Sequence, residues 1–149
     1  MDYESCEEHG TLLGSGGVIV IGEGTCMVRS LMVLLRFYHH ESCGQCTPCR
    51  EGTGWIERIC SRIEAGNAVE GDIDELYRIA DSMELRTICT LADAAAWPTK
   101  SFIEVFRGEF EAHIREGKCP HGGTFPDHLN LRGGGAPQRR EDPEHAFIA

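Results

Sequence analysis

Residues 41–52 read ESCGQCTPCREG, and this stretch is the most informative part of the chain for both fold and function. Cys43, Cys46 and Cys49 stand three residues apart, so a loop that curls back on itself can bring three thiols to one point. Gly44 suits such a loop because glycine adopts positive φ angles without a steric penalty. Compact triplets of this kind hold cubane clusters together with a fourth, distant cysteine. Zinc usually takes two separated cysteine pairs or a mixture of cysteine and histidine, so the spacing favours a [4Fe-4S] cluster over zinc.

A helix is expected to begin directly inside this motif. Threonine is a common N-cap and proline is favoured at the first helical position, so Thr47-Pro48 predicts that Cys49 lies in the first turn. The unpaired N–H groups and the positive end of the helix dipole would then face a negatively charged cluster and stabilise it. Arg50 either adds positive charge there or is a solvated surface residue, and the sequence leaves both interpretations open.

Three of the other five cysteines are predicted to be structural. Cys60 lies eleven residues after Cys49, which is roughly 16 Å along a helix, and it falls on an apolar stripe typical of a core position. Cys6 and Cys26 flank a short apolar run and show no ligand spacing.

The fourth ligand is therefore either Cys89 or Cys119. Cys119 precedes Pro120, like the Cys-Pro of bacterial ferredoxins, but it opens a stretch rich in glycine and proline that we expect to be a disordered tail over residues 117–149. Cys89 lies in an apolar link between the third helix and an alanine-rich turn before Trp97. A fixed link is the better place for a ligand, so Cys89 is favoured.

Composition narrows the class of protein. The 149 residues include 14 lysines and arginines against 24 aspartates and glutamates, for a formal net charge of −10. Such an acidic chain is a poor binder of phosphate backbones, so nucleic acid is not an expected partner. No apolar run is long enough to span a bilayer and no secretory signal is visible, so we expect a cytoplasmic protein in which clustered cysteines indicate metal binding.

Four helices and one strand are expected. The first helix spans about residues 27–40 and is apolar almost all round, which indicates burial. The second ends at Gly66, has Glu64 among the charges on its polar face, and carries an apolar stripe of Trp55, Ile56, Ile59, Cys60 and Ile63. The third is predicted to begin with Asp72 as its N-cap and Glu75 completing a capping box. The fourth has apolar residues at intervals of four, Phe102, Phe106, Phe110 and Ile114.

The expected strand is the β-branched run at residues 18–21, VIVI, bounded by glycines. Its composition and length are typical of a buried strand. A single strand is not stable by itself, so a neighbouring β element is expected to come from elsewhere.

Residues 41–52, together with residues 87–98, TICTLADAAAWP, resemble the NADH-binding flavoprotein subunit of NADH-quinone oxidoreductase, respiratory complex I. The resemblance runs from about residue 13 to about residue 114. It implies a mainly α fold, a four-helix bundle that follows a ubiquitin-like β domain and holds a [4Fe-4S] cluster. It also implies that the ligands are Cys43, Cys46, Cys49 and Cys89, which favours Cys89 over Cys119. In the family, this cluster accepts single electrons from FMN reduced by NADH and passes them towards further clusters and quinone.

The resemblance divides the chain into three parts: a remnant of the ubiquitin-like domain over residues 1–25, a helical cluster-binding domain over residues 26–116, and the tail. The family's domain for FMN and NADH has no counterpart in this sequence. We therefore expect a fragment or a split-gene product that is not catalytic alone, with FMN and NADH bound by a missing domain or a partner chain. Its expected partners are that domain and other iron-sulfur subunits, in the peripheral arm of a membrane-bound complex. Two alternatives are the matching subunit of an NAD-linked hydrogenase or formate dehydrogenase, and a structural metal-binding scaffold.

Overall fold

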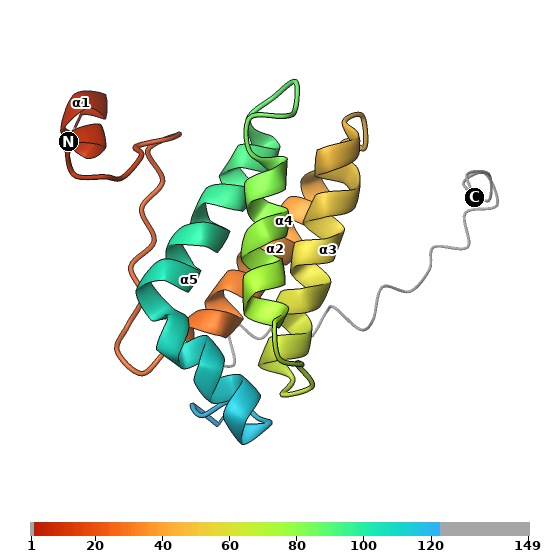
Figure 1. Cartoon of the computed structure of the whole chain (residues 1–149). Helices are drawn as coiled ribbons and strands as arrows, with labels where there is room; N and C mark the ends of the chain where they lie inside the picture. Colours follow the sequence, from red (N-terminus) through yellow and green to blue (C-terminus); the bar gives the residue numbers. More distant parts are fainter. Residues whose placement is uncertain (1, 123–149) are drawn as a thin grey trace.

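The computed structural model describes residues 2–122, and over this range it is mainly helical, as the sequence predicts. Four helices, α2 to α5, pack against one another, and a short helix α1 lies to one side of them (Figure 1). The bounds are α1 Tyr3–Glu8, α2 Met27–Glu41, α3 Thr47–Glu64, α4 Asp72–Met83 and α5 Leu91–Glu116. None of these helices is both long and apolar enough to cross a membrane.

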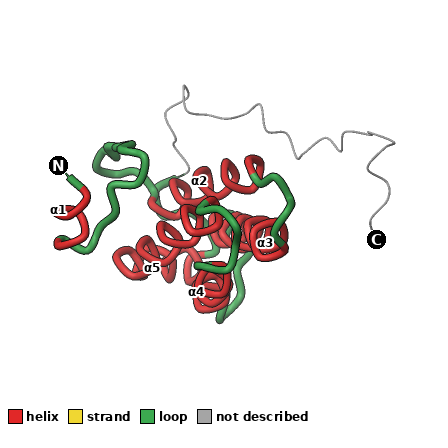
Figure 2. The backbone as a smooth tube through the Cα atoms, turned by 90° about the horizontal axis from the view of Figure 1, so that it is seen from above, coloured by secondary structure: helices red, strands yellow, loops and turns green. Residues whose placement is uncertain are grey.

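Short loops join consecutive helices among the four, so neighbours in sequence run antiparallel. The loops at residues 42–46 and 84–90 therefore meet at one end of the packed helices. The opposite end gathers the start of α2, the loop at residues 65–71 and the end of α5 (Figure 1). Figure 2 shows the molecule from above, with α2 to α5 grouped together and α1 to one side. These two ends are called the cysteine-loop end and the α5-terminus end below.

Aliphatic side chains fill the space between the four helices. Ile56, Ile63 and Cys60 of α3 are fully buried, and the Cys60 thiol donates a hydrogen bond to the carbonyl of Val28 at 3.5 Å. The predicted core position of Cys60 is thus confirmed. The prediction that Trp55 shares this stripe is wrong, because its side chain is 47% exposed and lines a shallow groove between α3 and α4.

The predicted buried strand at residues 18–21 is wrong. These residues form an exposed loop, with side chains between 39% and 89% exposed, and no strand occurs anywhere in residues 2–122. The physical reason is that a strand needs a paired neighbour, and the described part of the chain supplies none. The expected remnant of a β domain at residues 1–25 is accordingly not seen. The expected tail beyond residue 122 lies outside the described residues.

The start of α5 also differs from the prediction. The alanine-rich segment that was expected to be a turn is helical from Leu91 onward, because Ala92, Ala95 and Ala96 are strong helix formers that pack into the core. Pro98 lies inside this helix, and non-helical dihedral angles at Phe106 mark a kink further along.

Asp72 does not act as the N-cap of α4. Gly71 takes that position with a φ of 95°, and Asp72 is the first helical residue. Its buried carboxylate accepts hydrogen bonds from Arg62 Nε at 2.9 Å, from Arg62 Nη2 at 2.6 Å, and from the backbone N–H of Val69 at 2.9 Å. Asp72 therefore ties α4 to α3 across the intervening loop instead of capping its own helix.

We expect Asp72→Asn to lower the free energy of unfolding by about 1–3 kcal/mol at pH 7, because the substitution weakens two charged hydrogen bonds to a buried carboxylate. The hydrogen bonds from Arg62 hold the pKa of Asp72 below its usual value. The stabilisation is therefore complete above the unfolded-state pKa and is lost as the pH falls through the lower pKa of the folded state. Urea unfolding of both proteins at pH 7 and at pH 3 should show the difference shrinking in acid.

The matched control is Glu75→Gln, which removes an exposed pair with Arg78 in the same helix. Exposed pairs contribute little, so this variant should unfold like the wild type at either pH. An equal loss in both variants would contradict a special role for Asp72.

Candidate iron-sulfur site

The cysteine triplet lies where the loop at residues 42–46 enters α3. Cys46 is the N-cap of this helix, with extended backbone angles, and Thr47 and Pro48 are its first two residues. Cys49 follows in the first turn and is buried. The predicted helix start is confirmed to within one residue, since Cys46 and not Thr47 takes the cap position. The open N–H groups of a helix N-terminus are therefore close to two of the three thiols.

Side chains and backbone groups hold the loop in shape. Gly44 has a φ of 78°, a left-handed conformation that favours glycine, as its place in the motif predicts. Its N–H donates to Ser42 Oγ at 3.3 Å, and Ser42 Oγ lies 3.2 Å from Cys49 Sγ. Arg50 Nη1 donates to the Gly44 carbonyl at 3.0 Å. Arg50 also pairs with Glu51 at 2.9 Å and its side chain is 49% exposed, so it is a surface residue that braces the turn. A contribution of its charge to a bound cluster stays a prediction.

The segment that carries Cys89 lies beside this loop although it is more than forty residues away in sequence. The backbone N–H of Ile88 donates to Cys46 Sγ at 3.4 Å. Thr87 Oγ1 donates to the carbonyl of Cys89 at 2.8 Å and so shapes the turn before α5. Cys43 and Cys89 are exposed, and Cys46 is half-buried. The structure thus brings all four predicted ligands to the cysteine-loop end.

The surroundings fit a negatively charged cluster. Two helices, α3 and α5, begin at this end, and each presents the positive end of its dipole and its unpaired N–H groups. Soft thiolate ligands, four in number, are the donor set that a cubane cluster requires. The N–H of Ile88 already points at one of these sulfurs, as hydrogen bonds to cluster sulfurs do in such sites.

The remaining cysteines lie away from this site. Cys60 is in the core and Cys6 is in α1. Cys26 and Cys119 lie at the α5-terminus end, separated from the triplet by the length of α3, which is roughly 25 Å for 18 residues. Cys119 was expected to belong to a disordered tail, but it is half-buried and packs against the core.

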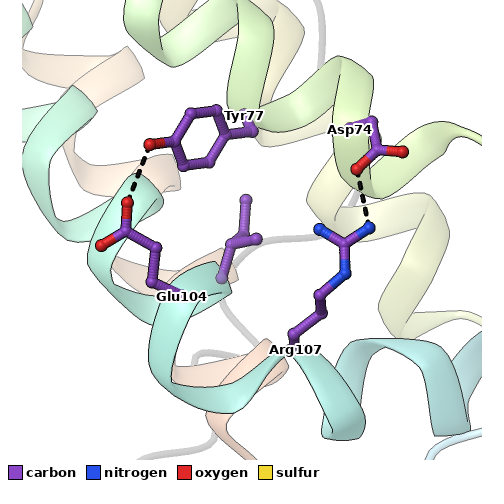
Figure 3. Close-up of a pocket in the computed structure, with 5 residues that line it drawn as sticks. Asp74, Tyr77, Glu104 and Arg107 are labelled. Carbon is purple, nitrogen blue, oxygen red and sulfur yellow. Dashed lines mark hydrogen bonds and ion pairs between the residues drawn. The ribbon is translucent and has the colours of Figure 1, made fainter.

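A small hollow on the surface between α4 and α5 has no comparable chemistry. It measures about 370 Å³ and is lined by Asp74, Tyr77, Ile103, Glu104 and Arg107 (Figure 3). Tyr77 donates to Glu104 at 2.8 Å, and Arg107 donates to Asp74 at 2.7 Å, so the polar groups around the hollow pair with one another.

Several residues around the cysteines were not predicted from the sequence. Ser42 contacts the thiol of Cys49, and the N–H of Ile88 contacts that of Cys46. Only Ser42 gives a sequence signal, because it directly precedes the triplet. At the α5-terminus end, helical periodicity predicts that Glu64 lies on the polar face of α3, but its side chain is buried. Its spacing of four residues from Cys60 could have indicated this. His113 was not singled out, although it lies three residues after the buried Phe110.

Comparisons with known proteins identify the family. Residues 29–113 match the NADH-ubiquinone oxidoreductase-F iron-sulfur binding region. The chain is 50% identical over 115 residues to the F subunit of NADH-quinone oxidoreductase from Rickettsia massiliae (strain Mtu5), an alignment that covers 77% of this chain and 27% of the relative. It is 47% identical over 115 residues to the F subunit of NADH-quinone oxidoreductase from Rickettsia bellii (strain OSU 85-389), covering 77% of this chain and 28% of the relative.

The chain spans little more than a quarter of the length of these relatives. The match over more than half of its residues, which includes the cysteine triplet and Cys89, nevertheless decides its family. The chain belongs to the family of the NADH-ubiquinone oxidoreductase-F iron-sulfur binding region.

Proposed function

We propose that this chain transfers single electrons through a [4Fe-4S] cluster held by Cys43, Cys46, Cys49 and Cys89, as part of an NADH-quinone oxidoreductase. In that assembly, electrons would come from NADH through FMN and continue towards quinone. The four packed helices α2 to α5 would act as a four-helix bundle whose cysteine-loop end carries the cluster. The resemblance of residues 41–52 and 87–98 to the family supports this assignment, as do the names of the relatives.

The observation that carries the proposal is the hydrogen bond from the Ile88 N–H to Cys46 Sγ. It supports a shared site for the triplet and Cys89, because residue 88 is the immediate neighbour of the fourth ligand. Cys119, the other candidate for that place, packs at the α5-terminus end. The contact therefore favours Cys89 independently of the family resemblance.

The residues around the thiols would bind the cluster and tune its potential. When bound, the cluster supplies a one-electron redox couple, whose potential depends on hydrogen bonds to its sulfurs and on exposure to solvent. Ile88 donates to a ligand sulfur and Ser42 lies against another, while the two helix N-termini stabilise negative charge. Cys43 and Cys89 are exposed, so redox partners could approach the site from that side.

FMN and NADH would be held by another domain or chain of the assembly, and further iron-sulfur subunits would receive the electrons. We place this assembly in the cytoplasmic peripheral arm of a membrane-bound complex. A structural metal-binding scaffold would need only one inert ion at the same cysteines. The difference between the two functions can be measured directly.

The full chain, purified without oxygen, should be brown and contain about four iron atoms and about four sulfides. Reduction with dithionite should produce the electron paramagnetic resonance signal of a reduced cubane. NADH should produce that signal only when a protein carrying the FMN domain is added. A colourless chain with one zinc ion bound at the cysteine loop would contradict the proposal and leave the scaffold.

A further inference from the structure

A second group of metal-binding side chains lies at the α5-terminus end, away from the cysteine loop. Its members are Cys26, Glu64, His113 and Cys119, and one ligand atom from each lies within 4.8 Å of all the others. The first three are buried, with His113 fully enclosed, and Cys119 is half-buried. They come from the start of α2, the last residue of α3, the last turns of α5 and the turn that follows it.

From this group of side chains we infer a second metal site, a structural zinc ion bound by Cys26 Sγ, Glu64 Oε2, His113 Nε2 and Cys119 Sγ. Two thiolates, one imidazole and one carboxylate form a ligand set that zinc accepts in four-coordinate sites. Hard cations such as Mg²⁺ and Ca²⁺ prefer oxygen ligands alone, so this set selects against them. The inference goes beyond the proposed electron transfer, since none of the four residues belongs to the cubane site.

The distances suit a tetrahedral ion. Cys26 Sγ lies 3.3 Å from His113 Nε2 and 3.4 Å from Glu64 Oε2, and these last two atoms are 3.1 Å apart. Metal bonds of about 2.0–2.3 Å in a tetrahedron place the ligand atoms roughly 3.3–3.8 Å from one another. Shifts of a few tenths of an ångström among these three atoms would therefore admit the ion. Cys119 Sγ lies within 4.8 Å of them and would complete the set after a shift of about 1 Å or less. A cubane could not fit, because its four iron corners hold the ligands much farther apart.

Neighbouring groups orient the ligands. His113 Nδ1 is 2.8 Å from the carbonyl of Glu109, so Nδ1 carries the proton and Nε2 is directed at the cluster. Glu64 Oε1 accepts a hydrogen bond from the Arg29 guanidinium, and the other oxygen, Oε2, faces His113 and Cys26. Metal-bound histidines and carboxylates are held by such outer hydrogen bonds.

The charges also balance. Two thiolates and a carboxylate around Zn²⁺ leave one negative charge, and Arg29 beside Glu64 supplies one positive charge. The alternative is a metal-free network in which Glu64 pairs with Arg29 and with protonated His113. Burial opposes protonation of His113, yet its hydrogen bonds to Glu64 and to the Glu109 carbonyl raise its pKa to about 9. In that network the thiols are neutral hydrogen-bonding groups, with Cys26 Sγ donating to Glu64 Oε2, whereas zinc would use all four side chains as ligands.

The test is the metal content of the full chain, purified without oxygen from cells grown with zinc. We expect about one zinc ion per chain in addition to the iron. Cys119→Ser should lower the zinc content at least tenfold and leave the iron content unchanged. Cys60→Ser is the control, because it removes a thiol that lies in the core and belongs to neither site, and it should keep both metals. Circular dichroism should show each variant folded.

Replacement of the zinc by Co²⁺ gives a second, spectroscopic readout. The cobalt spectrum of the wild type should show intense tetrahedral bands and charge transfer from thiolates, and Cys119→Ser should lose these bands together with the metal. A wild-type chain that takes up neither zinc nor cobalt would overturn the inference. The four side chains would then form the metal-free network of ion pairs described above. Zinc that is lost in Cys89→Ser but kept in Cys119→Ser would overturn it too, by locating the ion in the cysteine loop.

Discussion

Cys89→Ser is expected to lose the reduced-cluster resonance and to retain about three iron atoms per chain or fewer, where the wild type is expected to hold about four. A cubane needs one ligand for each iron corner, and the serine hydroxyl is a much weaker ligand than a thiolate. Since Cys89 is exposed and precedes α5 in a loop, the substitution should leave the helices intact. Iron analysis and electron paramagnetic resonance of the anaerobically purified protein provide the measurement.

Cys119→Ser serves as the control for this experiment, because it removes the other thiol that the sequence offers as a fourth ligand. It should keep the full iron content, as Cys119 packs at the α5-terminus end. Complete loss of iron in Cys119→Ser with retention in Cys89→Ser would reverse the assignment of ligands.

Gly66→Ala is expected to destabilise the chain by roughly 3–5 kcal/mol, among the largest effects of a single substitution. Gly66 follows the C-cap of α3, Ala65, and has a φ of 72°, which is unfavourable for any residue with a Cβ atom. An added Cβ would also overlap the backbone carbonyl of Gly117 at the end of α5. Because both obstacles are backbone features, a change of side-chain rotamer cannot relieve them. Urea unfolding followed by circular dichroism measures the loss.

Gly108→Ala is the matched control. Gly108 lies inside α5 with ordinary helical geometry, and an added Cβ there would meet nothing within 4 Å. Alanine is favoured over glycine in a helix by about 1 kcal/mol, so this variant should be slightly more stable than the wild type. If both variants lost similar amounts of stability, the close approach of α3 and α5 at Gly66 would not be what matters.

The parts of this structure that could be predicted from sequence are those governed by neighbours in the chain. The positive φ of Gly44 and the helix start near Thr47 follow from local rules of conformation. The burial of Cys60 follows from helical periodicity. Each of these depends on residues a few positions away.

The errors arise where distant contacts decide. Residues 18–21 have the composition of a strand but lie exposed, because a strand requires a partner that composition cannot supply. Asp72 has the sequence spacing of an N-cap, yet its carboxylate accepts hydrogen bonds from Arg62 of the preceding helix. In both cases the local sequence pattern is typical of the predicted element. For residues 18–21 the strand partner is missing from the described part of the chain, and for Asp72 a contact with another helix replaces the cap.

The group of Cys26, Glu64, His113 and Cys119 at the α5-terminus end could not be predicted from sequence for the same reason. Cys26 and Glu64 are 38 residues apart, and Glu64 and His113 are 49 apart. Only the short interval between His113 and Cys119 is visible as a motif, and a pair of ligands alone does not define a site. The packing of α2, α3 and α5 is what brings the four together.

The exposure of Cys43 and Cys89 bears on how the proposed cofactor would be acquired. The apolar core among α2 to α5 is formed largely without these two thiols, so the scaffold can fold before the cofactor arrives. A delivery protein could then transfer a preassembled cluster to the exposed cysteines at the cysteine-loop end without separating the helices. The same exposure gives dioxygen access to these cysteines, so oxidative damage should strip the cofactor and leave a folded chain that is ready to be reloaded.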